Sequence, residues 1–199
     1  MFLSKVWIEG YWAKDAYQLH RALWQLFPNR PEEQRDFLFR VEDKQPGRGA
    51  SVLLQSMHAP AGGDMAHVVA SKIYQPAIAV GAKLRFKLRA NPVKTIKDER
   101  KRVNAKGEIK RCRVPLITED AQLQWLARKL AGGAELNAAM VIPDSALYFH
   151  KNDISGKIQP VTFEGLMTVK HSEIFIKLLS QGVGPGKALG CGLLSLAFA

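Results

Sequence analysis

The chain has 199 residues, 29 of them Lys or Arg and 18 Asp or Glu, which gives a formal net charge of +11 at pH 7. A hydrophobic share of 47% suffices for a packed core and excludes a disordered basic tail. No apolar run approaches the roughly 18 residues of a membrane span, and residues 1–9 alternate like a strand and lack a signal-peptide core. We therefore expect a cytoplasmic protein without a membrane partner.

The residue types that usually bind metals are scattered along the chain. The two cysteines, Cys112 and Cys191, form no CxxC pair, and the five histidines never stand at the i, i+4 spacing of a helical metal site. No carboxylate-rich loop resembles a calcium or magnesium site. We expect chemistry that needs neither a metal nor another cofactor.

Hydrophobic periodicity predicts the order strand–helix–strand–strand–helix–strand in each half of the chain. The expected elements are residues 2–9, 14–27, 36–42, 51–58, 65–70 and 72–80 in the first half, and residues 83–90, 119–131, 146–150, 157–168, 172–181 and 193–198 in the second. Two consecutive βαββαβ units of this length are typical of ferredoxin-like domains. We therefore expect an α+β fold of two tandem ferredoxin-like domains, residues 1–81 and 82–199.

The first predicted helix carries Tyr17 and His20 at i, i+3 spacing, so their side chains share one face of the helix. One interpretation is that both reach a common reactive site, because histidine exchanges protons near neutral pH. The alternative is that Tyr17 packs against the core and His20 is a surface histidine.

Most of the excess charge lies between residues 83 and 113, where thirteen Lys and Arg stand against three acidic residues. The strand that opens this segment places Lys83, Arg85, Lys87 and Arg89 on one face. Like charges in a row repel one another unless an anion lies across them. We interpret this face as a phosphate contact, and a solvated edge strand is the alternative.

A basic arm follows that strand. Its cations are Lys94, Arg100, Lys101, Arg102, Lys110, Arg111 and Arg113, on either side of the turn signal Asn-Ala-Lys-Gly at residues 104–107. We interpret the segment as a basic hairpin or mobile arm that enters a groove of A-form RNA, where phosphates are dense. A basic loop without a specific role is the alternative.

A glycine-rich loop precedes the last predicted strand and contains Gly182, Gly184, Gly186, Lys187, Gly190 and Gly192. Glycines allow backbone N–H groups to approach phosphates closely. The loop is not a Walker motif, because Ala188 stands where a Ser or Thr is required and because a strand, not a helix, follows. These features argue against hydrolysis of nucleoside triphosphates.

These segments together resemble a known family. The glycine spacing is similar to that of the C-terminal loop in the repeat-associated proteins of CRISPR systems, which are built from ferredoxin-like domains. Further local motifs resemble the CasE-type precursor-crRNA endoribonucleases of the Cascade complex: Leu19-His20, Leu26-Phe27-Pro28, Leu88-Arg89-Ala90-Asn91-Pro92, Lys110-Arg111-Cys112-Arg113-Val114-Pro115-Leu116, Gly156-Lys157-Ile158-Gln159 and Phe163-Glu164-Gly165. The resemblance runs over essentially the whole chain.

The resemblance implies a metal-independent endoribonuclease that binds the stem-loop of a CRISPR repeat, cuts at the 3′ base of the stem and stays on the product as a Cascade subunit. It implies His20 as the active-site histidine and, as in some members, Tyr17 as a second site residue. Attack by the 2′-OH would leave a 2′,3′-cyclic phosphate and a 5′-OH, with histidine acting as base or acid. Lys157 or a cation of the arm would stabilise the phosphate charge.

Two further functions remain open at this stage. A catalytically silent RNA-binding scaffold subunit fits the same fold, because only one histidine is well placed. A nonspecific basic packaging protein fits the charge alone. We expect a protein that is monomeric when free, with a repeat RNA hairpin and other Cascade subunits as partners.

Overall fold

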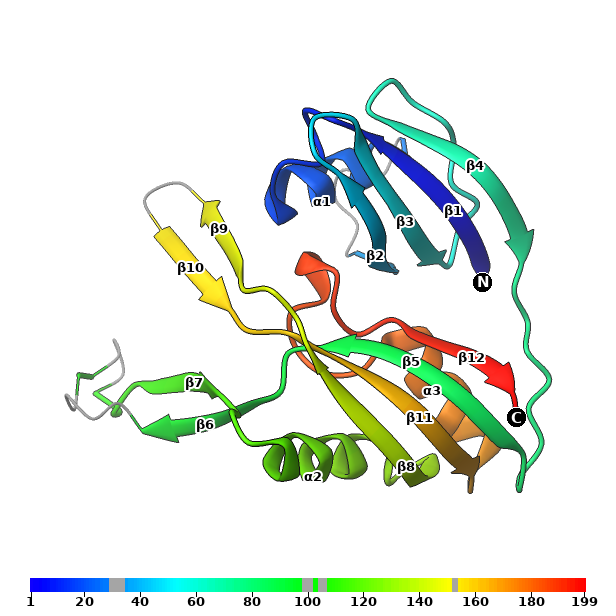
Figure 1. Ribbon diagram of the computed structural model, residues 1–199, viewed down its shortest axis with the longest axis vertical. Helices are drawn as coiled ribbons and strands as arrows, with labels where there is room; N and C mark the ends of the chain where they lie inside the picture. The colour runs from blue at the N-terminus through cyan, green and yellow to red at the C-terminus, as the bar shows by residue number, and fades with distance from the viewer. Residues whose placement is uncertain (29–34, 98–101, 104–106, 152–153) are drawn as a thin grey trace.

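The computed structural model describes residues 1–28, 35–97, 102–103, 107–151 and 154–199 (Figure 1). The first half holds β1 (Phe2–Glu9), α1 (Ala16–Trp24), β2 (Phe37–Gln45), β3 (Gly49–Ser56) and β4 (Ala66–Ile73). The second half holds β5 (Lys83–Ala90), β6 (Val93–Lys97), β7 (Arg111–Pro115), α2 (Glu119–Leu130), β8 (Ala134–Pro143), β9 (Leu147–Lys151), β10 (Ile154–Ile158), β11 (Val161–Val169), α3 (Ser172–Gln181), the short 3₁₀ helix η1 (Lys187–Leu189) and β12 (Leu194–Phe198). No helix among these residues is long and apolar enough to cross a membrane.

The N-terminal sheet has the strand order β2-β3-β1-β4, with every neighbouring pair antiparallel. Alternate residues of its strands point toward α1, and Val6, Ile8, Phe37 and Phe39 are buried there. Leu23 of α1 completes this core. The edge strand β2 therefore lies directly beneath the helix that carries His20.

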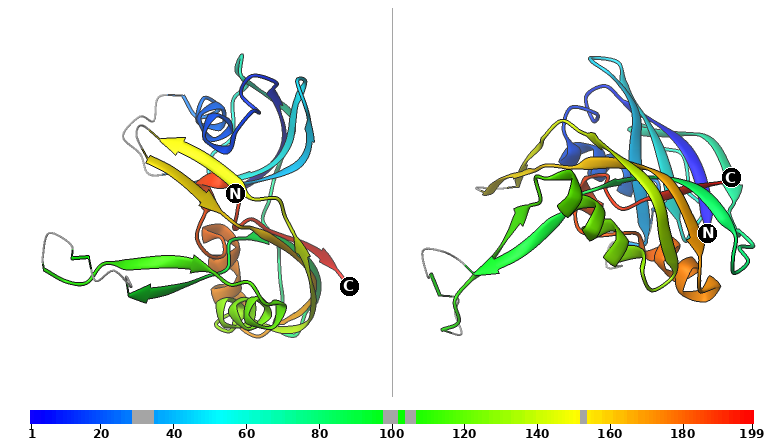
Figure 2. Two further views of the ribbon diagram at one scale, coloured as in Figure 1. Left: turned by 60° about the vertical axis from the view of Figure 1, so that its left-hand side comes forward. Right: turned by 60° about the horizontal axis from the view of Figure 1, so that its bottom comes forward.

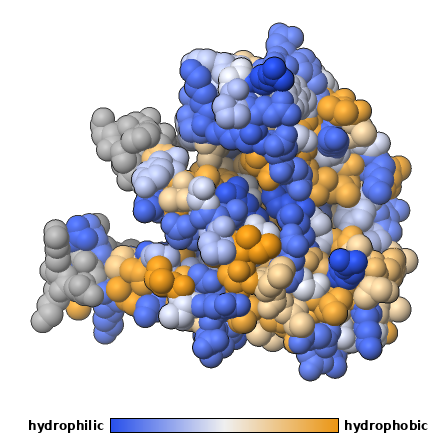
Figure 3. Space-filling model, in the orientation of Figure 1, coloured by the Kyte–Doolittle hydropathy of each residue, from blue (hydrophilic) through white to orange (hydrophobic). Residues whose placement is uncertain are grey.

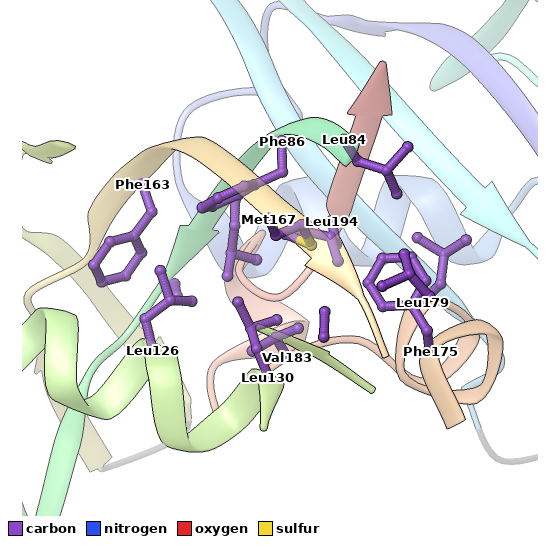
Figure 4. Packing of buried hydrophobic residues seen from close by; sticks show 14 of the residues in the cluster. Leu84, Phe86, Leu126, Leu130, Phe163, Met167, Phe175, Leu179, Val183 and Leu194 are labelled. Atoms are coloured by element: carbon purple, nitrogen blue, oxygen red, sulfur yellow. The ribbon is translucent and has the colours of Figure 1, made fainter. Parts of the chain in front are cut away.

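The C-terminal sheet has the order β12-β5-β11-β8 and is also antiparallel. Helices α2 and α3 cover one of its faces, and Figure 4 shows Leu130 of α2 and Phe175 of α3 in one buried cluster with Met167 of the sheet. Two hairpins, β6–β7 and β9–β10, leave this half on the same side of the molecule as α1 (Figure 2). The sheet thus supplies a rigid base for two projecting arms.

The second half has the βαββαβ order in β5, α2, β8, β11, α3 and β12, which confirms the ferredoxin-like expectation. In the first half the helix predicted at residues 65–70 is wrong, because these residues begin β4, which pairs with β1. Met and Ala favour helices in isolation, but pairing along the edge of β1 overrides that preference. The predicted strand at residues 72–80 is likewise wrong beyond Ile73. The domain boundary at residues 81 and 82 falls between β4 and β5 and stays a prediction.

Three smaller expectations in the second half and in α1 need correction. Strand β8 was not predicted, because its sequence AELNAAMVIP is rich in alanine and has little β-propensity. The single strand expected at residues 157–168 is two strands, β10 and β11, separated at Pro160, a residue that has no N–H for a ladder. Helix α1 is shorter than the expected residues 14–27.

Candidate active site

Helix α1 begins at a strong N-cap. The carboxylate of Asp15 accepts hydrogen bonds from the backbone N–H groups of Tyr17, at 2.8 Å, and Gln18, at 2.9 Å. Leu19 and Leu23 bury the inner face of the helix against the N-terminal sheet. Because His20 directly follows the buried Leu19 on the helix, its ring lies at the edge of this core.

The imidazole of His20 lies among aromatic rings. Its centroid is 5.8 Å from that of Phe37, 6.4 Å from that of Phe39 in a stacked arrangement and 6.3 Å from that of Trp24. Nε2 of His20 is buried and has no hydrogen-bond partner among the residues that the structure describes. Burial, and in second place the charge of Arg35, lower the pKa of His20 from 6.5 to about 4. His20 is therefore neutral at pH 7.

Arg35, just before β2, is the residue that sequence reasoning missed. Its charge disfavours a proton on His20, and within the described part of the chain its own Nη1 is buried without a hydrogen-bond partner. Buried polar atoms without partners are rare in folded proteins. Nη1 of Arg35 can donate to an oxygen of an anion, and a lone pair on Nε2 of neutral His20 can accept from a hydroxyl, so the two side chains together suit a phosphate group with a neighbouring hydroxyl.

Lys187 of the glycine-rich loop joins the same positive region. Burial, then Arg35 and then Lys129 lower the pKa of Lys187, and its Nζ donates a hydrogen bond to the carbonyl of Gln181. A cavity of about 370 Å³ is lined by Arg35, Lys187 and Phe37. His20 does not line this cavity, but its ring lies 5.8 Å from that of Phe37, at a tilt of 38°. The candidate site thus combines His20 and Arg35 from the first half of the chain with Lys187 from the second half.

The glycine-rich loop packs against β2. All five of its glycines have positive φ angles, between 76° and 95°. A Cβ on Gly182 would stand 2.7 Å from the side chain of Leu38, and one on Gly190 would stand 3.1 Å from the ring of Phe39. Packing alone therefore requires glycine at these two positions, and a contact between the loop and phosphate stays a prediction.

The cations of β5 are partly neutralised by neighbouring strands. Lys87 forms an ion pair with Glu164 at 3.0 Å, and Arg89 forms one with Asp144 at 3.1 Å. Strand β5 is an inner strand of its sheet, so the solvated edge strand is not what the structure has. Lys83 and Arg85 are exposed. A phosphate contact along this face stays a prediction, with fewer free charges than the sequence suggested.

The basic arm begins and ends as the hairpin β6–β7, one of the two forms expected for it. Its register places Arg111 opposite Lys97 and Arg113 opposite Thr95, so these exposed side chains share one face. Lys94 and Lys110 are also exposed, as is Arg102 farther along the arm, whereas Arg100 and Lys101 lie outside the described residues. Lys97 was not among the expected contact residues.

A cleft lies between the two hairpins, close to where they leave the C-terminal sheet, and Figure 3 shows it as a notch. It has a volume of about 540 Å³ and is lined by Arg113 of β7, Lys157 of β10 and Gly186 of the glycine-rich loop. Nζ of Lys157 lies 5.5 Å from the ring centroid of Tyr148. This cleft brings together three of the predicted contact segments, although it is separate from the cavity that holds Arg35 and Lys187.

Tyr17 and His20 lie on the same short helix, as expected, but no ring contact joins them among the described residues. Tyr17 is half-buried. The part of the chain that the structure describes contains no group of three or more His, Cys, Asp or Glu side chains that could hold a metal ion.

The family described as CRISPR associated protein matches residues 1–197. The chain is also 50% identical over 197 residues to the CRISPR system Cascade subunit CasE of Escherichia coli strain K12, covering 99% of both proteins. The chain belongs to this CRISPR-associated family and is of the CasE type. It is 36% identical over 202 residues to the CRISPR-associated endoribonuclease Cse3 of Thermus thermophilus, covering 91% of this chain and 89% of that protein.

Solved structures agree with this CasE-type assignment. The crystal structure of the CRISPR-associated protein Cas6e from E. coli K-12 superposes with a TM-score of 0.87 and 48% identity over the whole of both chains. The structure of T. thermophilus Cse3 bound to an RNA representing a pre-cleavage complex superposes with a TM-score of 0.75 and 32% identity, covering 98% of each chain. The fold of two ferredoxin-like units is therefore shared with these proteins.

Proposed function

We propose that this protein is an endoribonuclease that cleaves CRISPR repeat RNA at the 3′ base of the repeat stem-loop and remains on the product as a Cascade subunit. The family and the relatives named for endoribonuclease activity and for Cascade support the class of reaction. The observation that carries the assignment of the site is the buried, unpartnered Nε2 of His20 beside Arg35.

The reaction needs no metal in this proposal. Neutral His20 takes the proton of the 2′-OH, which attacks the adjacent phosphorus in line with the departing 5′-oxygen. Arg35 and Lys187 stabilise the charge that develops on the phosphoryl oxygens. Lys187, whose pKa is lowered, is the candidate donor of a proton to the leaving 5′-oxygen. The products are a 2′,3′-cyclic phosphate and a 5′-OH.

Recognition is assigned to the hairpins. The face of β6–β7 that carries Lys97, Arg111 and Arg113 meets the phosphates of the stem, and Lys157 in the cleft contacts RNA between the hairpins. Arg35 and Lys187 take over the charge-stabilising role that the sequence suggested for Lys157 or the arm. Tyr17 orients the RNA near His20.

The free protein in this proposal is a monomer with two domains, residues 1–81 and 82–199, and it acts in the cytoplasm, where the repeat RNA is made. Cleavage of a repeat hairpin in excess EDTA, with both new ends mapped, tests the function. We expect cutting that persists in EDTA and leaves a cyclic phosphate. A 5′-phosphate and 3′-OH pair would refute the mechanism, and binding without cutting would leave the scaffold role.

A further inference from the structure

Arg40 is a charged residue buried between the two halves of the protein. It lies on β2 and is only 4% exposed. Its Nη1 donates to the carbonyl of Lys87 on β5, at 3.1 Å, and to the carbonyl of Leu193, at 3.4 Å. Its Nε and Nη2 each lie 2.7 Å from Oε1 of Glu42. One guanidinium therefore joins the N-terminal sheet to two backbone positions of the second half.

The chemistry of this contact requires arginine. A buried cation is costly unless a partner and several hydrogen bonds compensate for the lost water. The planar guanidinium offers five N–H donors in a fixed fork, so one side can hold Glu42 while another reaches two carbonyls. A lysine ammonium carries the same charge but cannot span these acceptors in one geometry.

The carbonyls that Arg40 holds flank the attachment of the glycine-rich loop. The N–H of Gly192 donates to the carbonyl of Arg89 at 2.7 Å, and the N–H of Val183 donates to the carbonyl of Gly192 at 2.9 Å. The loop is thus tied to β5. Through its hydrogen bonds to Lys87 and Leu193, Arg40 connects β5 and the end of the loop to β2, the strand that follows Arg35.

We infer that Arg40 is a positioning residue, which holds the glycine-rich loop against β2 so that Lys187 lies beside Arg35 in the cavity between the two halves. This inference rests on the proposed function for its effect on catalysis. Arg40 itself does not touch the RNA, because its guanidinium is buried and turned toward backbone carbonyls. Its loss should therefore change the rate of cutting more than the affinity for the hairpin.

The test compares Arg40→Lys with Gln55→Leu. Gln55 is a matched control, because its Nε2 also makes one buried hydrogen bond between the halves, to the carbonyl of Leu179, away from the tie at Leu193. The pKa of Lys187 in the free protein is measured by NMR. Single-turnover cleavage and hairpin affinity are measured on the same variants.

We expect Arg40→Lys to raise the pKa of Lys187 toward its ordinary value and to slow cleavage by about 10- to 100-fold, with hairpin affinity changed less than about twofold. Gln55→Leu should leave the pKa of Lys187 unchanged. An unchanged pKa and rate in Arg40→Lys, or equal changes in both variants, would overturn the inference. If the wild-type protein fails to cut RNA, the proposed function falls, while the pKa measurement still decides the role of Arg40.

Arg40→Lys could fail to fold, and Glu42→Gln then takes its place. Glu42 is partly exposed, so its replacement spares the core and removes only the carboxylate that aims the guanidinium. We expect the same direction of change in the pKa of Lys187 and in the rate, with a smaller size. The inference would be contradicted if Glu42→Gln kept both the wild-type pKa of Lys187 and the wild-type cleavage rate.

Discussion

Gly190 of the glycine-rich loop lies directly against Phe39, because a Cβ on Gly190 would stand 3.1 Å from Cε2 of that ring. Phe39 in turn stacks on His20, with the ring centroids 6.4 Å apart. A loop in the second half of the chain therefore limits the position of the ring that supports the histidine of the first half. The glycine-rich loop acts on the site through packing.

Gly190→Ala is expected to lower the free energy of unfolding and to slow cleavage. The residue has a φ of 80°, where an alanine costs about 1–2 kcal/mol, and its methyl group would also displace Phe39. Gly47→Ala is the control, since Gly47 has a φ of 74° but nothing within 4 Å of a new Cβ. Gly190→Ala should lower both the free energy of unfolding, measured by chemical denaturation, and the single-turnover cleavage rate more than Gly47→Ala does. Equal effects of the two substitutions on cleavage would contradict the packing argument.

The sequence was informative where the local pattern agrees with the tertiary structure. Strand β5 alternates Lys and Arg with Leu and Phe, and helix α3 has a strong apolar face, so both were predicted close to their observed bounds. Strand β4 was not predicted, because Met65, Ala66 and Ala70 suggest a helix whereas Val68 and Val69 favour a strand, and pairing with β1 decides between them. Periodicity cannot detect a preference that only pairing creates.

Replacement of His20 is the direct test of the catalytic assignment. His20→Ala is expected to reduce the single-turnover rate by about 10²- to 10⁴-fold and to change hairpin affinity little, because proton transfer contributes to the transition state and not to ground-state binding. His171→Ala is a matched control at an exposed histidine. Tyr17→Phe should have a smaller effect than His20→Ala. A wild-type rate in His20→Ala would remove His20 from the mechanism.

The candidate site was only partly predictable for a physical reason. His20 and Tyr17 follow from the helix and the family resemblance, and Lys187 was found within the glycine-rich loop. Arg35 stands two residues before β2, and Arg40 lies within β2, among residues that have the pattern of an ordinary strand. Their roles depend on contacts with the second half of the chain, which no local pattern encodes. A buried cation in an apolar strand is the one signal that could have indicated Arg40.

Cleavage should depend on pH through His20 in an unusual range. As a base, His20 acts when neutral, so kcat/KM should fall only as the pH drops toward about 4, and not near 6.5. Burial is the larger cause of the lowered pKa and Arg35 the smaller. Arg35→Gln should therefore shift the decline of kcat/KM to a higher pH, although still below 6.5. A fall centred near 6.5 in the wild-type protein would contradict a neutral, buried His20.

The same lowered pKa makes stability depend on pH. The unfolded chain binds a proton at His20 below about pH 6.5, whereas the folded protein does so only near 4. The contribution of His20 is therefore complete above pH 6.5 and is lost as the pH falls from 6.5 to 4. Because the side chain is partly exposed, the expected loss is only about 1–2 kcal/mol. Between pH 6.5 and 4 the free energy of unfolding, measured by denaturation, should fall by about 1–2 kcal/mol more in the wild type than in His20→Ala.

The salt dependence of hairpin binding separates the exposed Arg111 and Arg113 of the arm from the ion-paired Lys87 and Arg89 of β5. Arg111 and Arg113 are exposed on one face of β6–β7, whereas Lys87 is paired with Glu164 and Arg89 with Asp144. Each lost phosphate contact removes roughly 0.7 to 0.9 from the slope of log K against log salt.

We expect Arg111→Gln with Arg113→Gln to weaken binding and to flatten that slope by two contacts, and Lys87→Gln to change it little. Because the contacts are to the RNA backbone, stems of altered sequence and equal length should lose affinity to the same extent. An unchanged slope in the arm variant, measured by binding titrations at several salt concentrations, would show that this face of the hairpin does not grip the stem. It would then be free to meet another protein subunit, and the defect would appear only on assembly.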